Sequence, residues 1–169
     1  MATAAVQDLR AKSDKSLARL KAQLAGMEPH LERADAPGEW TTRQVLCHLL
    51  GAPERDPVAM LRGFAEHDLP VVEIKPGDVH VTPERQKMTL GDLVGALEGQ
   101  QRAVFAYLEG LDDRAIEARK ARIPLFKQFM GTDEISLAAY VGAMFGFHWK
   151  DHTGQLAKIR QAAGLPTAG

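Results

Sequence analysis

Residues 144–156 read MFGFHWKDHTGQL, and this stretch decides how the rest of the chain is interpreted. His148 and His152 stand four residues apart in a segment with helical periodicity, so both imidazoles leave the same face of the helix. Steps of three and four residues from this pair meet apolar side chains, such as Met144 before it and Leu156 after it. A buried imidazole without a partner is unfavourable. The pair therefore predicts a metal site to which one helix gives two ligands, or else two core histidines.

Two of the expected helices lie in the N-terminal half. Residues 6–28 repeat apolar side chains at a spacing near that of a helix, which is expected to end before Pro29. A second helix starts at Thr41, whose side chain can cap it while Gln44, three residues later, completes a capping box. Pro57 is expected to restart this helix after a break.

Two further helices are expected in the C-terminal half. Thr89 caps the third, which ends near Gly110. After a connector, the final helix opens at Thr132 or Ser136 and runs to Ala163. No segment convincingly predicts a sheet, so the four helices indicate an all-α protein built as a four-helix bundle.

Residues 67–88 separate the second helix from the third, and their prolines predict a long loop with at most short extended pieces. A loop of this length is uncommon in a compact domain, and it indicates either a functional segment or a fault in the helix assignment. About ten extended residues cross a bundle roughly 30 Å long, so the flanking helices could run parallel. His30 and His67 are expected at the surface, whereas His80 is a candidate for a pocket.

Composition limits the classes of function. A chain of 169 residues with 45% hydrophobic and 25% charged residues fits one globular domain, expected at residues 1–165 with a short frayed tail at 166–169. Lysine and arginine number 21 against 22 acids, which gives no sign of a nucleic-acid groove. No apolar run predicts a signal peptide or a membrane span. The single cysteine, Cys47, suits a reducing cytoplasm.

A third imidazole is expected near the first two. His48 shares one face of the second helix with Val45 and Leu49, so it too lies in an apolar stripe. Three neutral imidazole nitrogens from two helices, each about 2.0–2.1 Å from an ion, leave a coordination position open, as in catalytic metal sites. Imidazole suits zinc, nickel, iron and copper alike, so the ligands do not select the metal.

With these motifs the chain resembles the DinB/YfiT-like superfamily of helical-bundle metalloenzymes. The resemblance lies in WT at 40–41, HLL at 48–50, HWKDHTGQL at 148–156, IR at 159–160 and GLP at 164–166. The order of the expected helices agrees with that of the superfamily along almost the whole chain, although each motif is short.

The resemblance implies a bundle with up-down-down-up connections, which agrees with the long crossover. It also implies a three-histidine site for a divalent ion (nickel, zinc or iron), homodimers, and relatives that act as thiol-dependent transferases or isomerases. In such relatives a low-molecular-weight thiol binds the metal as its thiolate, because a divalent cation deprotonates a coordinating thiol.

Other side chains are candidates for the surroundings of the site. Gln155 lies near the inner face, where it could hydrogen-bond a ligand imidazole or a water on the metal. Tyr140 and Met144 are expected in the core or in a pocket. A basic cluster either is solvated or receives the carboxylates of an anionic thiol. It comprises Arg119, Lys120, Arg122 and Lys127. Cys47 and Asp151 each precede a ligand by one residue and so point about 100° away from it.

These expectations leave two classes of function open. The first is an enzyme acting on a small molecule, expected to be a thiol-dependent S-transferase for small electrophiles or, alternatively, a metal-dependent hydrolase. The second is a non-catalytic metal-binding stress-response protein. No general acid or base is evident beside the ligands. Phe147 and Trp149 cannot both face inward with His148, so they are expected to leave aromatic surface that a homodimer would cover.

Overall fold

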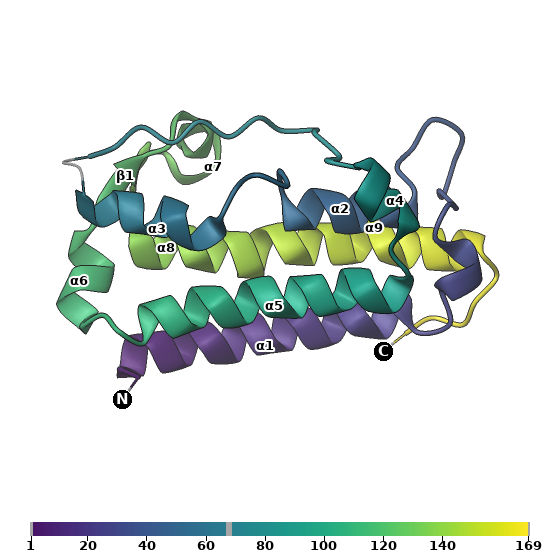
Figure 1. The fold of residues 1–169 in the computed structure, drawn as a ribbon, viewed down its shortest axis with the longest axis horizontal. Helices are drawn as coiled ribbons and strands as arrows, with labels where there is room; N and C mark the ends of the chain where they lie inside the picture. Colours follow the sequence, from purple (N-terminus) through teal and green to yellow (C-terminus); the bar gives the residue numbers. More distant parts are fainter. Residues whose placement is uncertain (1, 67–68, 169) are drawn as a thin grey trace.

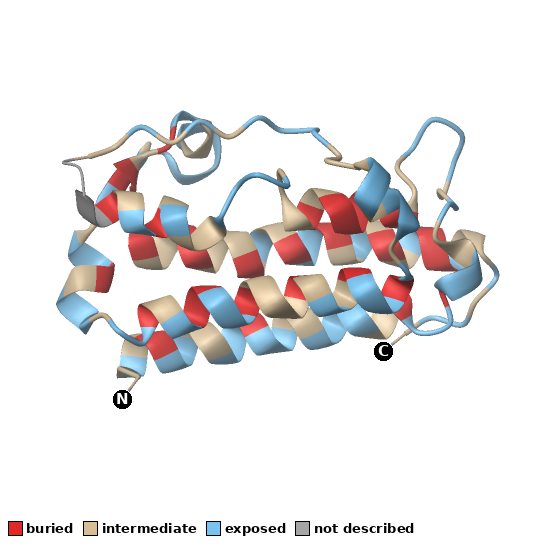
Figure 2. Ribbon diagram, viewed as in Figure 1, coloured by how far each residue is buried: buried red, intermediate tan, exposed pale blue. Residues whose placement is uncertain are grey.

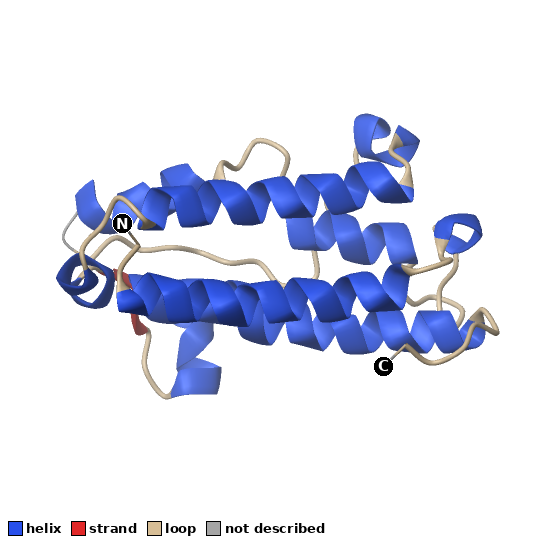
Figure 3. Ribbon diagram, turned by 90° about the horizontal axis from the view of Figure 1, so that it is seen from below, coloured by secondary structure: helices blue, strands red, loops and turns tan. Residues whose placement is uncertain are grey.

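The structure is a computed structural model that describes residues 2–66 and 69–168, so His67 lies outside the described residues. Most of the described chain is helical, and the long helices pack side by side into a four-helix bundle (Figure 1). The all-α class and the bundle expected from the sequence are confirmed. Seen from below, the strands are confined to one end of the molecule (Figure 3).

The bundle has four positions, and two of them are filled by helices that are broken along their length. In order, the positions hold α1 (Ala4–Leu24), α2 and α3 (Thr42–Leu50 and Pro57–Glu66), α5 (Leu90–Leu108), and α8, η3 and α9 (Leu137–Gly142, Ala143–His148 and Trp149–Ala162). Figure 1 shows α1 and α9 running one way and α2, α3 and α5 running the other, which is the expected up-down-down-up order. The second and third positions are parallel because the crossover from residue 69 returns along the whole bundle to α4 (Pro83–Lys87).

The helices begin where the sequence predicts capping side chains. Thr41 accepts from the backbone N–H of Gln44 at 3.2 Å, and the Gln44 amide oxygen accepts from the Thr41 N–H at 2.8 Å. Thr89 and Asp92 form a second capping box at the start of α5. Ser136, not Thr132, caps the final helix, since its hydroxyl accepts from a backbone N–H at 3.1 Å.

The first helix ends earlier than the sequence suggested. It was expected to reach residue 28, but α1 ends at Leu24 and a short 3₁₀ turn, η1 (Glu28–His30), follows. Gly26 has a φ of +75°, the left-handed conformation that commonly terminates a helix. The glycine therefore stops the helix before Pro29 can.

The connector between α5 and α8 holds more structure than expected. It contains α6 (Asp113–Ala118), β1 (Lys120–Arg122), η2 (Pro124–Phe126), α7 (Lys127–Met130) and β2 (Glu134–Ser136). The expectation that no sheet forms was wrong, because β1 and β2 pair antiparallel with Ala121 opposite Ile135. Each strand has three residues and buries only its central one, so neither is long enough to show an alternating pattern in the sequence.

The sheet also holds one end of the crossover. The backbone N–H of Val72 donates to the Arg122 carbonyl at 2.9 Å, and the Arg122 N–H donates to the Pro70 carbonyl at 2.8 Å. The crossover, expected as a loop, thus starts against β1 and ends in α4, a helix that the sequence did not reveal.

The last bundle helix is not α-helical throughout. Its buried residues Leu137, Val141, Phe145 and Trp149 follow at four-residue steps, and each such step rotates about 40° past a full turn of an α-helix. The π-helical segment η3 offsets this rotation, because its wider turn holds more residues than an α-helical turn. Phe145 and Trp149 therefore both reach the core, with ring centroids 4.9 Å apart in an edge-to-face contact.

The buried side chains line the inward faces of the bundle helices (Figure 2). Leu20, Leu46, Leu97, Val104 and Leu156 are among those with no exposed surface. In the described part of the chain, no helix has both the length and the apolar character needed to cross a membrane.

Arg43, a buried arginine on α2, joins that helix to the start of α5. Its side chain is 8% exposed and forms an ion pair of 2.5 Å with Glu32. It also donates to the carbonyl oxygens of Arg85 at 2.8 Å and Met88 at 2.7 Å. Hydrogen bonds from a charged donor to buried acceptors contribute more than neutral ones.

We predict that Arg43→Met lowers the free energy of unfolding by about 2–4 kcal/mol, because the two carbonyl oxygens lose a charged donor and are left buried. Urea unfolding of the metal-free protein measures the loss. Arg19→Met, at an exposed position of α1, is the control and should change the value by less than about 0.5 kcal/mol. Equal stability of the two variants would contradict the assigned role of Arg43.

Candidate metal centre

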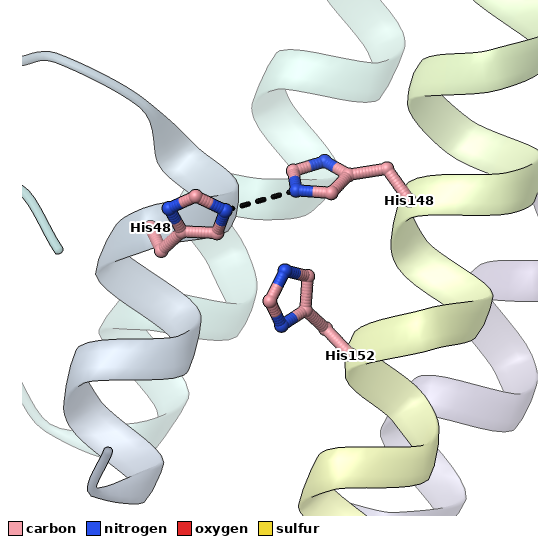
Figure 4. Close-up of side chains that lie close together, drawn as sticks. All are labelled: His48, His148 and His152. Carbon is pink, nitrogen blue, oxygen red and sulfur yellow. Dashed lines mark hydrogen bonds between the residues drawn. The ribbon is translucent and has the colours of Figure 1, made fainter. Parts of the chain in front are cut away.

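Three histidines from two bundle positions meet between α2 and α9. His48 comes from α2, His148 ends η3 and His152 lies one turn further along in α9. One ring nitrogen from each lies within 4.8 Å of the other two. Figure 4 shows these nitrogens turned toward a common point. Within the described ranges, no carboxylate or thiol joins the group.

The hydrogen bond made by His48 fixes which of its nitrogens faces the group. Its Nδ1 lies 2.6 Å from the backbone carbonyl oxygen of Asp78, in the crossover. A carbonyl oxygen only accepts, so Nδ1 carries the proton and donates. The neutral ring then has its lone pair on Nε2, which faces His148. This is the arrangement found around metal-ligating histidines.

His152 is held in the same way by a neighbour in its own helix. Its Nδ1 lies 2.8 Å from the amide oxygen of Gln155, which accepts the proton of that nitrogen. Nε2 of His152 is therefore the nitrogen with the lone pair, and it is the one turned toward the other two rings in Figure 4. Gln155 was a candidate for such a contact because it lies three residues from His152 on the same face.

The spacing of the nitrogens fits a shared ion. Nε2 of His48 lies 2.9 Å from Nε2 of His148. Two nitrogens that each lie about 2.0–2.1 Å from one ion are separated by no more than about 4.2 Å. The 2.9 Å separation satisfies this limit, whereas the 4.8 Å span of the whole group exceeds it by about 0.6 Å.

Burial favours the neutral form of two of these imidazoles, His148 and His152. Burial, with smaller contributions from the positive forms of His152 and His48, lowers the pKa of His148 to about 4. Burial also lowers the pKa of His152, although its hydrogen bond to Gln155 acts in the opposite direction. Neutral imidazoles are the form that binds metals, so His148 is available as a ligand well below neutral pH, and the pKa of His152 is shifted in the same direction.

Two aromatic rings cover the group. The ring of Trp40 is parallel to His152 within 6°, with centroids 5.9 Å apart, and lies 4.9 Å from the centroid of His48. His80, the pocket candidate, stacks on His48 within 7° at 6.4 Å, and burial lowers its pKa. Trp40 entered the sequence analysis only as part of a motif. Its position directly before the cap residue Thr41, about two helical turns before His48, was the available signal for its role.

Several other candidates lie away from the three histidines. Tyr140 is buried between Phe64 and Phe126, its hydroxyl contacts Met60 Sδ at 3.6 Å, and burial raises its pKa to about 12. Met144 is a half-buried residue packed against the core. Asp151 is exposed, and Cys47 is buried in the core with its pKa raised by burial.

The two arginines of the basic cluster form ion pairs and hydrogen bonds with other side chains. Arg122 pairs with Asp133 at 3.1 Å and Glu134 at 3.5 Å, and Arg119 donates to the Tyr107 hydroxyl at 3.4 Å. Lys120 and Lys127 are exposed. None of these contacts joins the cluster to the three histidines.

Of the two aromatic residues that flank His148, only one is at the surface. Phe147 is 68% exposed and lies near Phe129, whose ring centroid is 6.4 Å away. Trp149 has no exposed surface, so the two residues do not both face inward, as expected, and of the two only Phe147 leaves aromatic surface. The π-helical turn brings Trp149 into line with Phe145.

Comparison with solved structures identifies a protein with a similar fold. YfiT from Bacillus subtilis superposes with a TM-score of 0.71 over 95% of this chain and 89% of that chain, at 18% sequence identity. The chain shares the fold of YfiT. The resemblance to the DinB/YfiT-like group is thereby confirmed for the fold, which is all that a likeness at this identity establishes. YfiT is described as a probable metal-dependent hydrolase with an unusual four-helix bundle topology. No protein-family model and no curated protein matches the sequence.

We predict that the metal-free protein loses stability as the pH falls from 7 toward 5. The folded-state pKa of His148 is about 4, below its usual 6.5, so the unfolded chain binds a proton in this interval and the folded one does not. The stability that neutral His148 contributes is complete above pH 6.5 and is lost as the pH falls toward 4. Urea unfolding after chelation measures this dependence, which should be shallower in His148→Gln.

The matched control for that measurement is His30→Gln, which removes a histidine from η1. Its pH dependence should be close to that of the wild type. A His148→Gln variant as sensitive to pH as the wild type would contradict the burial of a neutral imidazole at position 148.

Proposed function

We propose that this protein is a metal-dependent hydrolase in which His48, His148 and His152 hold one divalent ion. The observation that supports the proposal is the convergence of three ring nitrogens, two of which have their lone pairs directed inward by carbonyl acceptors on the opposite ring nitrogen. Structural zinc sites are normally closed by four protein ligands, whereas three leave a position for a reactant. This favours an enzyme over a metal site that only stabilises the bundle.

The chain's own residues would orient the ligands and limit access by water. The Asp78 carbonyl and the Gln155 amide hold His48 and His152 in the tautomer that an ion requires. Trp40 covers the same two rings from one side. When bound, a divalent ion supplies Lewis acidity and makes water a nucleophile at neutral pH. Nickel, zinc and iron all suit imidazole ligands, and the identity of the ion is left to measurement.

Hydrolysis takes precedence over the S-transferase activity expected from the sequence for two reasons. The related fold belongs to a protein described as a probable metal-dependent hydrolase. The arginines considered as receptors for an anionic thiol are engaged with other side chains. A low-molecular-weight thiol as co-substrate therefore stays a prediction, and the assay below includes it.

Four expectations about substrate, assembly, location and partners also stay predictions. They are a small-molecule substrate, a homodimer, a cytoplasmic location, and the absence of nucleic-acid and membrane partners. Light scattering at tens of micromolar addresses the dimer directly.

We predict that protein purified without a histidine tag contains about one divalent ion per chain. Elemental analysis should show that the His148→Ala, His152→Ala double variant loses this ion, while His30→Ala retains it. Chelation should lower the melting temperature of the wild type, because an ion that binds only the folded state stabilises it. Full occupancy in the double variant would refute the ligand assignment.

We predict that the metal-loaded protein hydrolyses small activated substrates and that His148→Ala abolishes this turnover. A panel of esters, amides and epoxides is assayed with no thiol and then with glutathione, bacillithiol or mycothiol. Turnover without a thiol supports the hydrolase, and turnover that consumes a thiol supports the transferase instead. An inactive panel combined with a large fall in melting temperature on chelation would favour the non-catalytic stress-response protein.

A further inference from the structure

Arg85 lies on α4, outside the three-histidine group, and connects two segments that meet at His48. Its Nη1 donates to the carbonyl oxygens of Gly51 at 2.6 Å, His80 at 3.0 Å and Cys47 at 3.3 Å. The Cys47 and Gly51 carbonyls belong to the end of α2, where backbone acceptors lack partners within the helix. The His80 carbonyl belongs to the crossover. One guanidinium thus ties the end of the helix that carries His48 to the segment that passes over it.

That segment is the one that orients His48. Asp78, two residues before His80, supplies the carbonyl that accepts from His48 Nδ1 at 2.6 Å. His80 has a φ of +53°, in the left-handed region that side chains other than glycine rarely adopt. Such a conformation persists only where surrounding contacts hold it. The hydrogen bond from Arg85 to the His80 carbonyl is a contact of this kind.

We propose that Arg85 is a positioning residue: by pinning the crossover at His80 it holds the Asp78 carbonyl against His48 and fixes that ring in its Nδ1–H tautomer. A neutral imidazole without a fixed acceptor carries its proton on either nitrogen. A proton on Nε2 occupies the lone pair that a metal needs. The effect on metal affinity rests on the metal site proposed above, whereas the tautomer is a property of the metal-free protein.

The chain offers a matched control for loss of an arginine at this place. Arg43 also connects α2 with the region of α4, but its side-chain hydrogen bonds go to Glu32, Arg85 and Met88. Arg43→Met should therefore destabilise the protein while the side-chain hydrogen bonds of Arg85 to Cys47, Gly51 and His80 remain. His80→Gly is the second control, since glycine adopts a positive φ readily and keeps the carbonyl while it removes the ring.

The test reads the protonated nitrogen of His48 by long-range proton–nitrogen NMR on nitrogen-15-labelled, metal-free protein near neutral pH. The wild type, Arg43→Met and His80→Gly should show His48 protonated on Nδ1. Arg85→Met should show a mixture of the two tautomers or protonation on Nε2. Arg85→Lys should recover part of the wild-type signal, because an ammonium group can still donate to one carbonyl. Assignment uses the loss of the His48 signals in His48→Gln.

A titration with Co²⁺ provides the second measurement. Arg85→Met should raise the dissociation constant roughly 10- to 100-fold, as expected when the contacts that orient a ligand are lost, and Arg43→Met should leave it near the wild-type value. If Arg85→Met does not fold, Arg85→Gln and Arg85→Lys are compared in its place.

Three results would overturn the proposal. These are a wild-type His48 protonated on Nε2, an unchanged tautomer in the folded Arg85 variants, or an equal shift in Arg43→Met, which would indicate general loosening. If the tautomer of His48 changes in Arg85→Met but the wild type binds no Co²⁺, the metal site is refuted and the role of Arg85 is supported. The two proposals therefore fail in distinguishable ways.

Discussion

Three imidazole nitrogens, held close together inside an apolar bundle, are the constraint on which the surrounding structure depends. Removing a polar atom from water without giving it a partner costs free energy. The outer nitrogens of His48 and His152 meet this demand through carbonyl oxygens of Asp78 and Gln155. The inner nitrogens face one another. Nε2 of His48 lies 2.9 Å from Nε2 of His148, so these two nitrogens share one hydrogen bond, and burial lowers the pKa of His148 to about 4. A metal ion satisfies all three inner nitrogens at once.

The sequence predicted the parts of this arrangement that follow from local rules. The four-residue spacing of His148 and His152, and the capping side chains at Thr41 and Thr89, depend only on residues within one or two helical turns. The length of the crossover allowed the second and third positions of the bundle to run parallel, and the resemblance to the DinB/YfiT-like group implied that order. His48 was placed correctly because it shares an apolar face with its neighbours, although the packing of α2 against α9 was not visible in the sequence.

The remaining features arise from contacts between distant residues, and they have little or no signature in the sequence. Any residue at position 78 offers a backbone carbonyl, so nothing about Asp78 marks it as the partner of His48. The strands β1 and β2 are too short to show periodicity, and α4 lies in a segment dominated by prolines. Which of Phe147 and Trp149 faces inward was not predicted, because an α-helix was assumed throughout. The run of four-residue steps from Leu137 to Trp149 was the available signal that the helix widens.

The π-helical turn η3 also limits how this chain can change in evolution. Such a turn holds one residue more than an α-helical turn over the same span. A one-residue deletion within residues 143–148 would convert this turn to α-helical geometry and leave the residues after it facing as before. A one-residue deletion in α8 has no extra residue to offset it, and it would rotate His148 and His152 by about 100° away from His48. In an alignment with other bundles of this fold, a single-residue gap therefore belongs within residues 143–148 and not elsewhere between Leu137 and His152.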